Sequence, residues 1–221
     1  MRPNVALRNC ILPTQKQLKA SQVYADLMEE AKPRFDCIDA AVRGRTGLPG
    51  PAVQEFCFLQ LRLLCELIAP SCLIAHGDIT ATHGNKLAKE YAADKIMKAL
   101  EGLHPDFYPH PVLFRITPPG PGFPGHVHID RKSSGFLSKP ELLTLYGRCG
   151  DLLHRGTVKK LVSAKMPVRV NFPEIVNWTN KIVVLLDGHH IASMDGKLHF
   201  LCILRNANDK DRVQVTIAEA P

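Results

Sequence analysis

The stretch LSKPELLTLYGRCGDLLHRG, residues 137–156, has the pattern of an amphipathic helix with marked ends. Ser138 precedes Glu141 by three residues, which is the spacing of a capping box, and Gly156 is placed to end the helix. At about 100° per residue the apolar side chains fall on one face. That face is formed by Leu142, Leu145, Tyr146, Cys149, Leu152 and Leu153. The stretch therefore predicts a helix that packs on a hydrophobic core through this face.

Polar side chains lie on the opposite face of the same predicted helix. Arg148, Asp151 and His154 are three residues apart, so they form a ladder that rises about 9 Å, and Asp151 can bridge the other two. Gly147 and Gly150 run beside the ladder and let another backbone or a ligand come close. An imidazole can transfer protons near neutral pH, and a guanidinium can hold a phosphate. The three ladder residues are therefore the candidate catalytic residues, and an ordinary solvated helix face is the alternative.

Helices are predicted in the first half of the chain and strands in the second. Recurring apolar positions predict helices at about 14–45, 52–68 and 85–103. The following segment is rich in proline and glycine and can hold two short strands, VLFRI and HVHID. After Met166 the apolar and β-branched runs at 181–186, 197–204 and 212–218 predict strands of an antiparallel meander.

These elements predict an α+β fold. An N-terminal α-helical bundle is expected over residues 1–160, with a Pro/Gly-rich insertion at 104–137, and an antiparallel β-meander at 161–221 is expected to pack on the bundle. Trp178 is expected to anchor the sheet to the bundle. The histidines at 189, 190 and 199 lie near Asp-Gly pairs, and we expect them on turns and strand surfaces.

Positive charge is concentrated in one segment of the sequence. Between Arg131 and Arg169 there are nine Lys and Arg residues against two acidic residues, whereas the rest of the chain is balanced at 19 of each. The formal net charge of +7 therefore belongs to this segment. Such a cluster suits a polyanion such as nucleic acid, and a solvated basic face is the alternative. The candidate nucleic-acid-binding residues are Arg131, Lys132, Arg155, Lys159 and Lys160.

The remaining features favour a soluble, cofactor-free protein inside the cell. The most apolar stretch, residues 56–75, carries Arg62 and Glu66, so it predicts a buried helix with an ion pair one turn apart and not a membrane span. In an alternative role Glu66 would reach the ladder helix and support Arg148. No secretory signal is recognised at the start, and the seven cysteines form no CxxC pair, so a cytoplasmic protein with reduced thiols is expected. No nucleotide-binding motif is present, and no cofactor is expected.

One segment could in principle bind a metal ion. In GHVHID, His126 and His128 fall on the same side of a predicted strand, as a metal site requires. No second cluster with matching spacing accompanies them, so the prediction is that the protein has no metal site, with this pair as the weaker alternative.

The Arg148 and His154 pair, near the end of a helix in a helical body of this size, resembles the signature of the HEPN superfamily of nucleic-acid-associated helical domains. The resemblance covers roughly residues 14–156. It implies a helical bundle and a metal-independent endoribonuclease of a toxin–antitoxin, antiviral defence or RNA-processing system, with RNA as substrate. It also implies a homodimer, for which the Gly147/Gly150 face is the candidate, and a cognate partner protein. The residue after the motif arginine is usually polar in active members, and here it is Cys149.

Two further functions remain open at this point. One is a helical module that binds a partner or nucleic acid through the basic segment and is catalytically silent, as are the members of the superfamily that have lost catalysis. The other is a metal-binding protein that uses His126 and His128.

Overall fold

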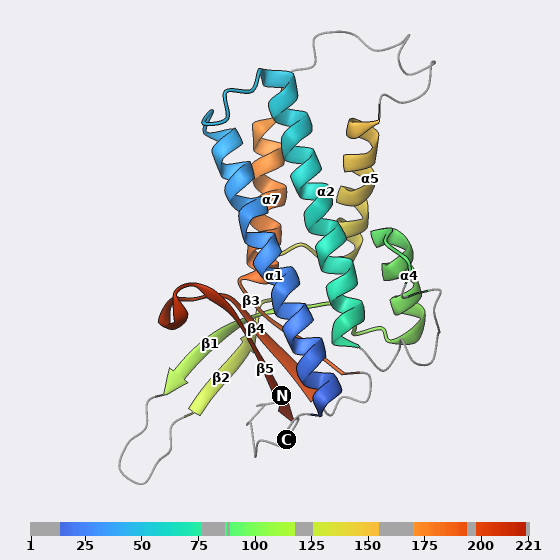
Figure 1. The fold of residues 1–221 in the computed structure, drawn as a ribbon, viewed down its shortest axis with the longest axis vertical. Helices are drawn as coiled ribbons and strands as arrows, with labels where there is room; N and C mark the ends of the chain where they lie inside the picture. Colours follow the sequence, from blue (N-terminus) through green and yellow to red (C-terminus); the bar gives the residue numbers. More distant parts are fainter. Residues whose placement is uncertain are drawn as a thin grey trace.

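The computed structural model describes residues 14–76, 87, 89–117, 126–154, 170–193 and 198–219. These parts of the chain form five α-helices and five β-strands, so the predicted α+β class is confirmed (Figure 1). The helices are α1 (Gln15–Val42), α2 (Gly50–Ala75), α4 (Ala93–Leu103), α5 (Lys139–Leu153) and α7 (Phe172–Leu186). The strands are β1 (His110–Thr117), β2 (His126–Arg131), β3 (Gly188–Ala192), β4 (Leu198–Asn206) and β5 (Arg212–Glu219).

Helix α2 lies at the centre of the helical bundle and contacts α1, α4, α5 and α7. Its side chains Cys57, Phe58, Leu61, Leu64 and Ile68 are fully buried. Burial of each large apolar side chain contributes roughly 1.5–3 kcal/mol, so this helix organises the core. By length and composition α2 alone among the described helices could cross a membrane, but most of it is buried inside the protein, which is typical of the core helix of a soluble protein.

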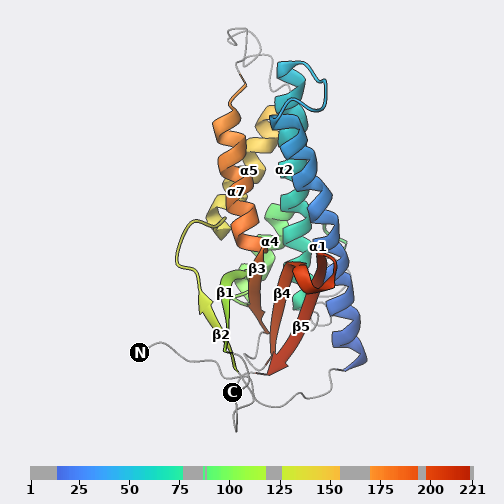
Figure 2. The same cartoon turned by 90° about the vertical axis from the view of Figure 1, so that its left-hand side faces the viewer.

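The sheet is antiparallel and lies at one end of the bundle, with strand order β2-β1-β3-β4-β5 (Figure 2). Helix α1 packs against β5 and β4. Alternate residues of β3 and β4 face the helices, and among them Ile191, Phe200, Cys202 and Leu204 join the hydrophobic core. The two strands predicted in the Pro/Gly-rich segment are confirmed, and they form a hairpin that joins the same sheet as the C-terminal strands.

The prediction of a strand at 181–186 was wrong, because these residues form the second half of α7. Asn171 caps this helix by accepting a hydrogen bond from the backbone of Glu174, and Pro173 lies in the first turn. Ile175, Ile182 and Leu185 are buried at helical spacing. A short apolar run does not by itself distinguish a strand from a buried helix, and the cap upstream decides the matter. Trp178 therefore lies on a helix of the bundle.

Candidate functional site

Helix α5 presents its two faces as the sequence predicts. Ser138 and Glu141 form the capping box, in which the backbone N–H of Ser138 donates to Glu141 Oε2 at 2.9 Å. On the apolar face Leu142, Leu145 and Cys149 are fully buried. On the opposite face the residues of the ladder, Arg148, Asp151 and His154, are all exposed. The C-terminal half of α5 is thus fixed to the core on one side and open to solvent on the other.

The guanidinium of Arg148 is held by a carboxylate that the sequence analysis missed. Its Nε donates to Oε1 of Glu174 at 3.0 Å, and its Nη2 donates to Oε2 at 3.4 Å. The Arg148 side chain remains 46% exposed, whereas that of Glu174 is 20% exposed. The Cζ atom of Arg148 also lies 5.7 Å from the centre of the Phe58 ring. The hydrogen bonds that Arg148 donates to Glu174 raise the pKa of Arg148, so this side chain is fixed in its charged form.

Glu174 lies in the first turn of α7, and the local sequence explains its position. Asn171 caps α7 through its side chain, and its Nδ2 donates to Glu174 Oε2 at 3.3 Å. The backbone N–H of Asn171 donates to Gln54 Oε1 on α2 at 3.2 Å, which ties the start of α7 to the bundle. Figure 2 shows that α7 starts at the same end of the bundle where α5 ends. The first turn of α7 is therefore in place to orient Arg148.

Asp151 and His154 occupy the last turn of α5 and its end. Asp151 contributes to the electrostatic attraction that raises the pKa of Arg148, after the larger effect of Glu174. His154 is the C-cap residue, and its backbone N–H donates to the Gly150 carbonyl at 3.0 Å. The helix thus ends at His154, whose side chain is exposed. The bridge from Asp151 to His154 stays a prediction.

A second polar cluster connects α5 to α2. The predicted ion pair between Arg62 and Glu66 is confirmed, with Nε and Oε1 3.0 Å apart. The hydroxyl of Tyr146 accepts from Arg62 Nη2 at 2.8 Å and donates to Glu66 Oε1 at 3.2 Å. Glu66 therefore does reach α5, but its partner there is Tyr146, and Glu174 is the carboxylate that binds Arg148.

The two glycines of α5 have different surroundings. A Cβ atom at Gly150 would lie 3.6 Å from Arg62 Nη1 of the same chain. A Cβ atom at Gly147 would meet nothing within 4 Å. Gly147 is therefore the glycine that leaves open space beside the ladder, and the homodimer stays a prediction for that side of the helix.

The residues predicted to bind nucleic acid or metal do not gather at the ladder. Arg131 and Lys132 lie at the end of β2, in the sheet, whereas α5 ends at the far end of the bundle (Figure 1). Arg155, Lys159 and Lys160 lie outside the described residues. His126 and His128 are in β2, whose Asp130 pairs with Arg115 at 2.5 Å. Across the described ranges no three His, Cys, Asp or Glu side chains are arranged to hold a metal ion.

The histidines expected on turns and strand surfaces are instead largely buried, so that prediction was wrong. The Asp-Gly pair at 187–188 joins α7 directly to β3, a central strand, and is not a hairpin turn. His189 is fully buried, His190 is 7% exposed and His199 is partly buried. Consecutive residues of a strand point to opposite faces, and both faces of β3 are covered at this point. The sequence gives no signal that β3 is central.

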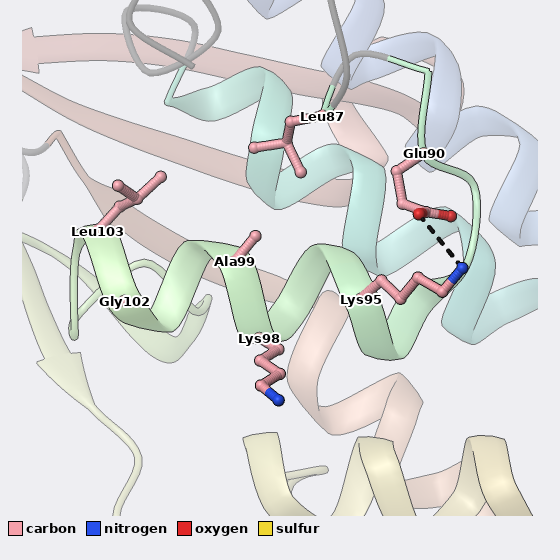
Figure 3. Close-up of a pocket in the computed structure, with 7 residues that line it drawn as sticks. All are labelled: Leu87, Glu90, Lys95, Lys98, Ala99, Gly102 and Leu103. Atoms are coloured by element: carbon pink, nitrogen blue, oxygen red, sulfur yellow. Dashed lines mark ion pairs between the residues drawn. The ribbon is translucent and has the colours of Figure 1, made fainter. Parts of the chain in front are cut away.

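A hollow of about 520 Å³ lies along α4 (Figure 3). Its walls are formed by Leu87, Glu90, Lys95, Lys98, Ala99, Gly102 and Leu103. Figure 3 shows Glu90 and Lys95 turned toward each other, and their charged atoms are 3.5 Å apart. None of the candidate catalytic residues lines this hollow, so the ladder of α5 is a separate, open surface.

No protein-family model, no curated protein and no solved structure matches this chain. The fold and the geometry of α5 are therefore the observations from which a function can be argued.

Proposed function

We propose that this protein is a HEPN-like, nucleic-acid-associated protein that cleaves RNA without a metal ion at the exposed face of α5. The observation that carries the proposal is that Arg148 and Asp151 are exposed on a helix whose other side is fixed in the core, and that His154, also exposed, is the C-cap of the same helix. A guanidinium, a carboxylate and an imidazole on one rigid surface are the groups that this chemistry requires.

In the proposed reaction the 2′-hydroxyl of the substrate is the nucleophile. His154 takes the proton of this hydroxyl, the 2′-oxygen attacks the adjacent phosphorus, and the bond from phosphorus to the 5′-oxygen breaks. The leaving 5′-oxygen takes up a proton from solvent, so the products are a 2′,3′-cyclic phosphate and a 5′-hydroxyl. Arg148 stabilises the negative charge on the phosphate oxygens, and Asp151 orients His154.

The pairing of Arg148 with Glu174 fits this role in a specific way. The carboxylate holds the Nε and Nη2 edge of the guanidinium, and Nη1 lies on the other edge, which can face a phosphate. A guanidinium fixed in this way loses little side-chain entropy when a phosphate binds. Glu174 is therefore proposed as a residue that positions Arg148.

A catalytically silent binding module is the second candidate, and the same pair is the observation that favours it. Glu174 already matches the charge of Arg148, as it would in an ion pair that serves only to join α5 and α7. In that case nucleic acid would bind through the basic segment, and its affinity would fall with salt while no strand is cut.

A cleavage assay in EDTA separates the two candidates. Wild-type protein should cut a panel of single-stranded and structured RNAs, and His154→Ala should lower the rate by about 10²–10⁴-fold. Arg148→Ala should lower it by about 10²–10³-fold, because the charge on the phosphate is then unmatched. His128→Ala, on β2, is the matched control and should cut like wild type. Intact RNA throughout the panel, with salt-dependent binding retained, would establish the silent module.

The resemblance to HEPN proteins also suggests a setting for this activity. We propose a cytoplasmic homodimer that meets through the open side of α5 at Gly147 and acts in a toxin–antitoxin or antiviral defence system with a cognate partner protein. Light scattering would show the dimer, and Gly147→Leu should then yield monomers whose circular dichroism is unchanged.

A further inference from the structure

The β1–β2 hairpin is joined to the rest of the sheet through a narrow junction. Six residue pairs connect β1 with β2, five connect β3 with β4 and seven connect β4 with β5. Only two pairs connect β1 with β3, and these are His110 with His190 and Pro111 with His189. Pro111 has no N–H, so backbone pairing at this junction is weak. Side-chain contacts at the junction therefore decide how firmly the hairpin is held.

Three histidines meet at this junction on one face of the sheet. His110 and His190 are direct cross-strand partners, and His190 Nε2 lies 2.5 Å from Nδ1 of His199 on β4. His110 Nε2 lies 2.5 Å from Oδ1 of Asp106, in the loop before β1. These three residues, His110, His190 and His199, are called the histidine latch below.

The contact between His190 and His199 depends on protonation. The ring centres are 4.7 Å apart and the ring planes differ by 25°, so the two nitrogens face each other nearly in the plane of both rings. Such a contact is a hydrogen bond only when one nitrogen carries a proton and the other keeps its lone pair. If both rings are protonated, two N–H groups and two positive charges oppose each other. This contact joins β3 to β4, and it breaks when the second proton binds. The positive charge on His190 then lies beside His110 of β1, its cross-strand partner.

The surroundings make this second proton costly. Burial, together with the nearby His199 and Arg131, lowers the pKa of His190 to about 3. Burial and Arg131 also lower the pKa of His199. Asp106 is the carboxylate that acts on His190, and it is already bonded to His110. Helix α7 meets β3 at the opposite face, where the Leu186 carbonyl faces His189.

We propose that the histidine latch is an acid-sensitive device that holds the β1–β2 hairpin on the sheet at neutral pH and releases it when the latch is protonated. Phe114 and Val112 pack at the same junction, and a Cβ atom at Gly188 would lie 3.1 Å from Phe114 Cε2. These apolar contacts also hold β1, so release separates them from β3, and we expect the helical bundle to stay folded. The proposal is independent of any activity at α5.

The size of the effect follows from proton linkage. In the released state His190 is solvated, and its pKa returns to the ordinary value near 6.5. Between pH 7.5 and 5.5 the released state therefore binds a proton at His190 that the state with the hairpin held does not bind. The equilibrium constant for release of the hairpin then rises about tenfold through this one histidine. Protonation of His199 adds to this effect.

Hydrogen exchange of the full chain tests the latch. Exchange is measured by mass spectrometry at pH 7.5 and 5.5 and is corrected for intrinsic exchange rates. Peptides that cover β1 should lose about tenfold in protection at the lower pH, because a two-stranded hairpin released from the sheet is at most marginally stable and its own backbone pairs open. Peptides from α2 should remain better protected than β1 at both pH values, because the opening is local. His190→Gln should remove the tenfold part of the response that belongs to His190 and leave a smaller response, whereas His128→Gln, on the same hairpin, should respond like wild type.

Several results would overturn the proposal. They are equal protection of β1 at both pH values, protection of β1 that matches α2 throughout, or a full pH response in His190→Gln. Loss of β1 protection on adding EDTA at pH 7.5 would show that a metal ion holds the junction instead. If His190→Gln does not fold, an NMR titration of the wild-type His190 ring decides the matter, because titration near pH 6.5 contradicts the latch and titration well below it supports the latch.

Discussion

Lowering the pH from 7.5 to 4.5 should destabilise the whole protein through His189, the histidine on the helix-facing side of β3. Its Nδ1 lies 3.1 Å from the Leu186 carbonyl, which can only accept, so Nδ1 carries the proton. Its Nε2 then accepts from the hydroxyl of Tyr24 at 2.5 Å. Both nitrogens are satisfied in the neutral ring, and burial lowers the pKa of His189 to about 4.

The magnitude and the sign follow from this pKa. Between pH 6.5 and about 4 the unfolded chain binds a proton at His189 that the folded chain does not bind, so the free energy of unfolding falls as the pH falls. Each pKa unit corresponds to about 1.4 kcal/mol, so the shift from 6.5 to about 4 gives a full loss of about 3.5 kcal/mol, of which about 2.5 kcal/mol is reached by pH 4.5. The free energy of unfolding of a domain is typically about 5–15 kcal/mol, so this loss is large enough to measure.

Urea unfolding followed by circular dichroism at pH 7.5, 6.0, 5.0 and 4.5 measures this slope. The variant His189→Gln should be less stable than wild type at pH 7.5 but should depend less on pH, by up to about 1.4 kcal/mol per pH unit below pH 6. His154→Gln, at the exposed end of α5, should keep the wild-type slope. Equal slopes in wild type and His189→Gln would refute the assignment of a neutral, buried imidazole.

Three further changes test other parts of the structure. Tyr24→Phe removes the donor to His189 and should cost about 1–3 kcal/mol in urea unfolding, because Nε2 is then buried without a partner; no loss would contradict the hydrogen bond. Ser138→Ala removes the N-cap hydroxyl of α5 and should cost about 1 kcal/mol at pH 7, read as a lower melting temperature, and an unchanged melting temperature would mean that the cap is not formed. Gly147→Ala should raise the free energy of unfolding by up to about 1 kcal/mol, because Gly147 lies in a helix interior and the new Cβ would have open space around it. A free energy of unfolding below that of wild type would show that another surface packs there.

The sequence predicts those features that depend on local pattern. The two faces of α5 follow from the spacing of Leu142, Leu145 and Cys149, and the capping box follows from Ser138 and Glu141, because both need only residues within one helix. The hairpin strands and the ion pair on α2 are local in the same sense.

Features that depend on tertiary contacts could not be predicted. The partner of Arg148 is 26 residues away on α7, and the apolar run in this helix is rich in β-branched residues and therefore predicts a strand. The cap formed by Asn171, with Glu174 in the first turn, is the signal that could have identified the helix and brought Glu174 close to α5. The burial of His189 and His190 depends on β3 being a central strand, which is a property of the sheet order.

The proposed nuclease is tested most directly by the chemistry of the cut itself. An RNA that wild-type protein cleaves in EDTA at one position is prepared with a single 2′-deoxy nucleotide at that position, and both forms are incubated with the protein and analysed by mass spectrometry. If Arg148 and His154 act as proposed, the all-ribose RNA yields a 2′,3′-cyclic phosphate and the 2′-deoxy RNA stays whole, because the attacking hydroxyl is missing. Cleavage of the 2′-deoxy RNA, or dependence of the cut on a divalent metal ion, would contradict the proposed mechanism.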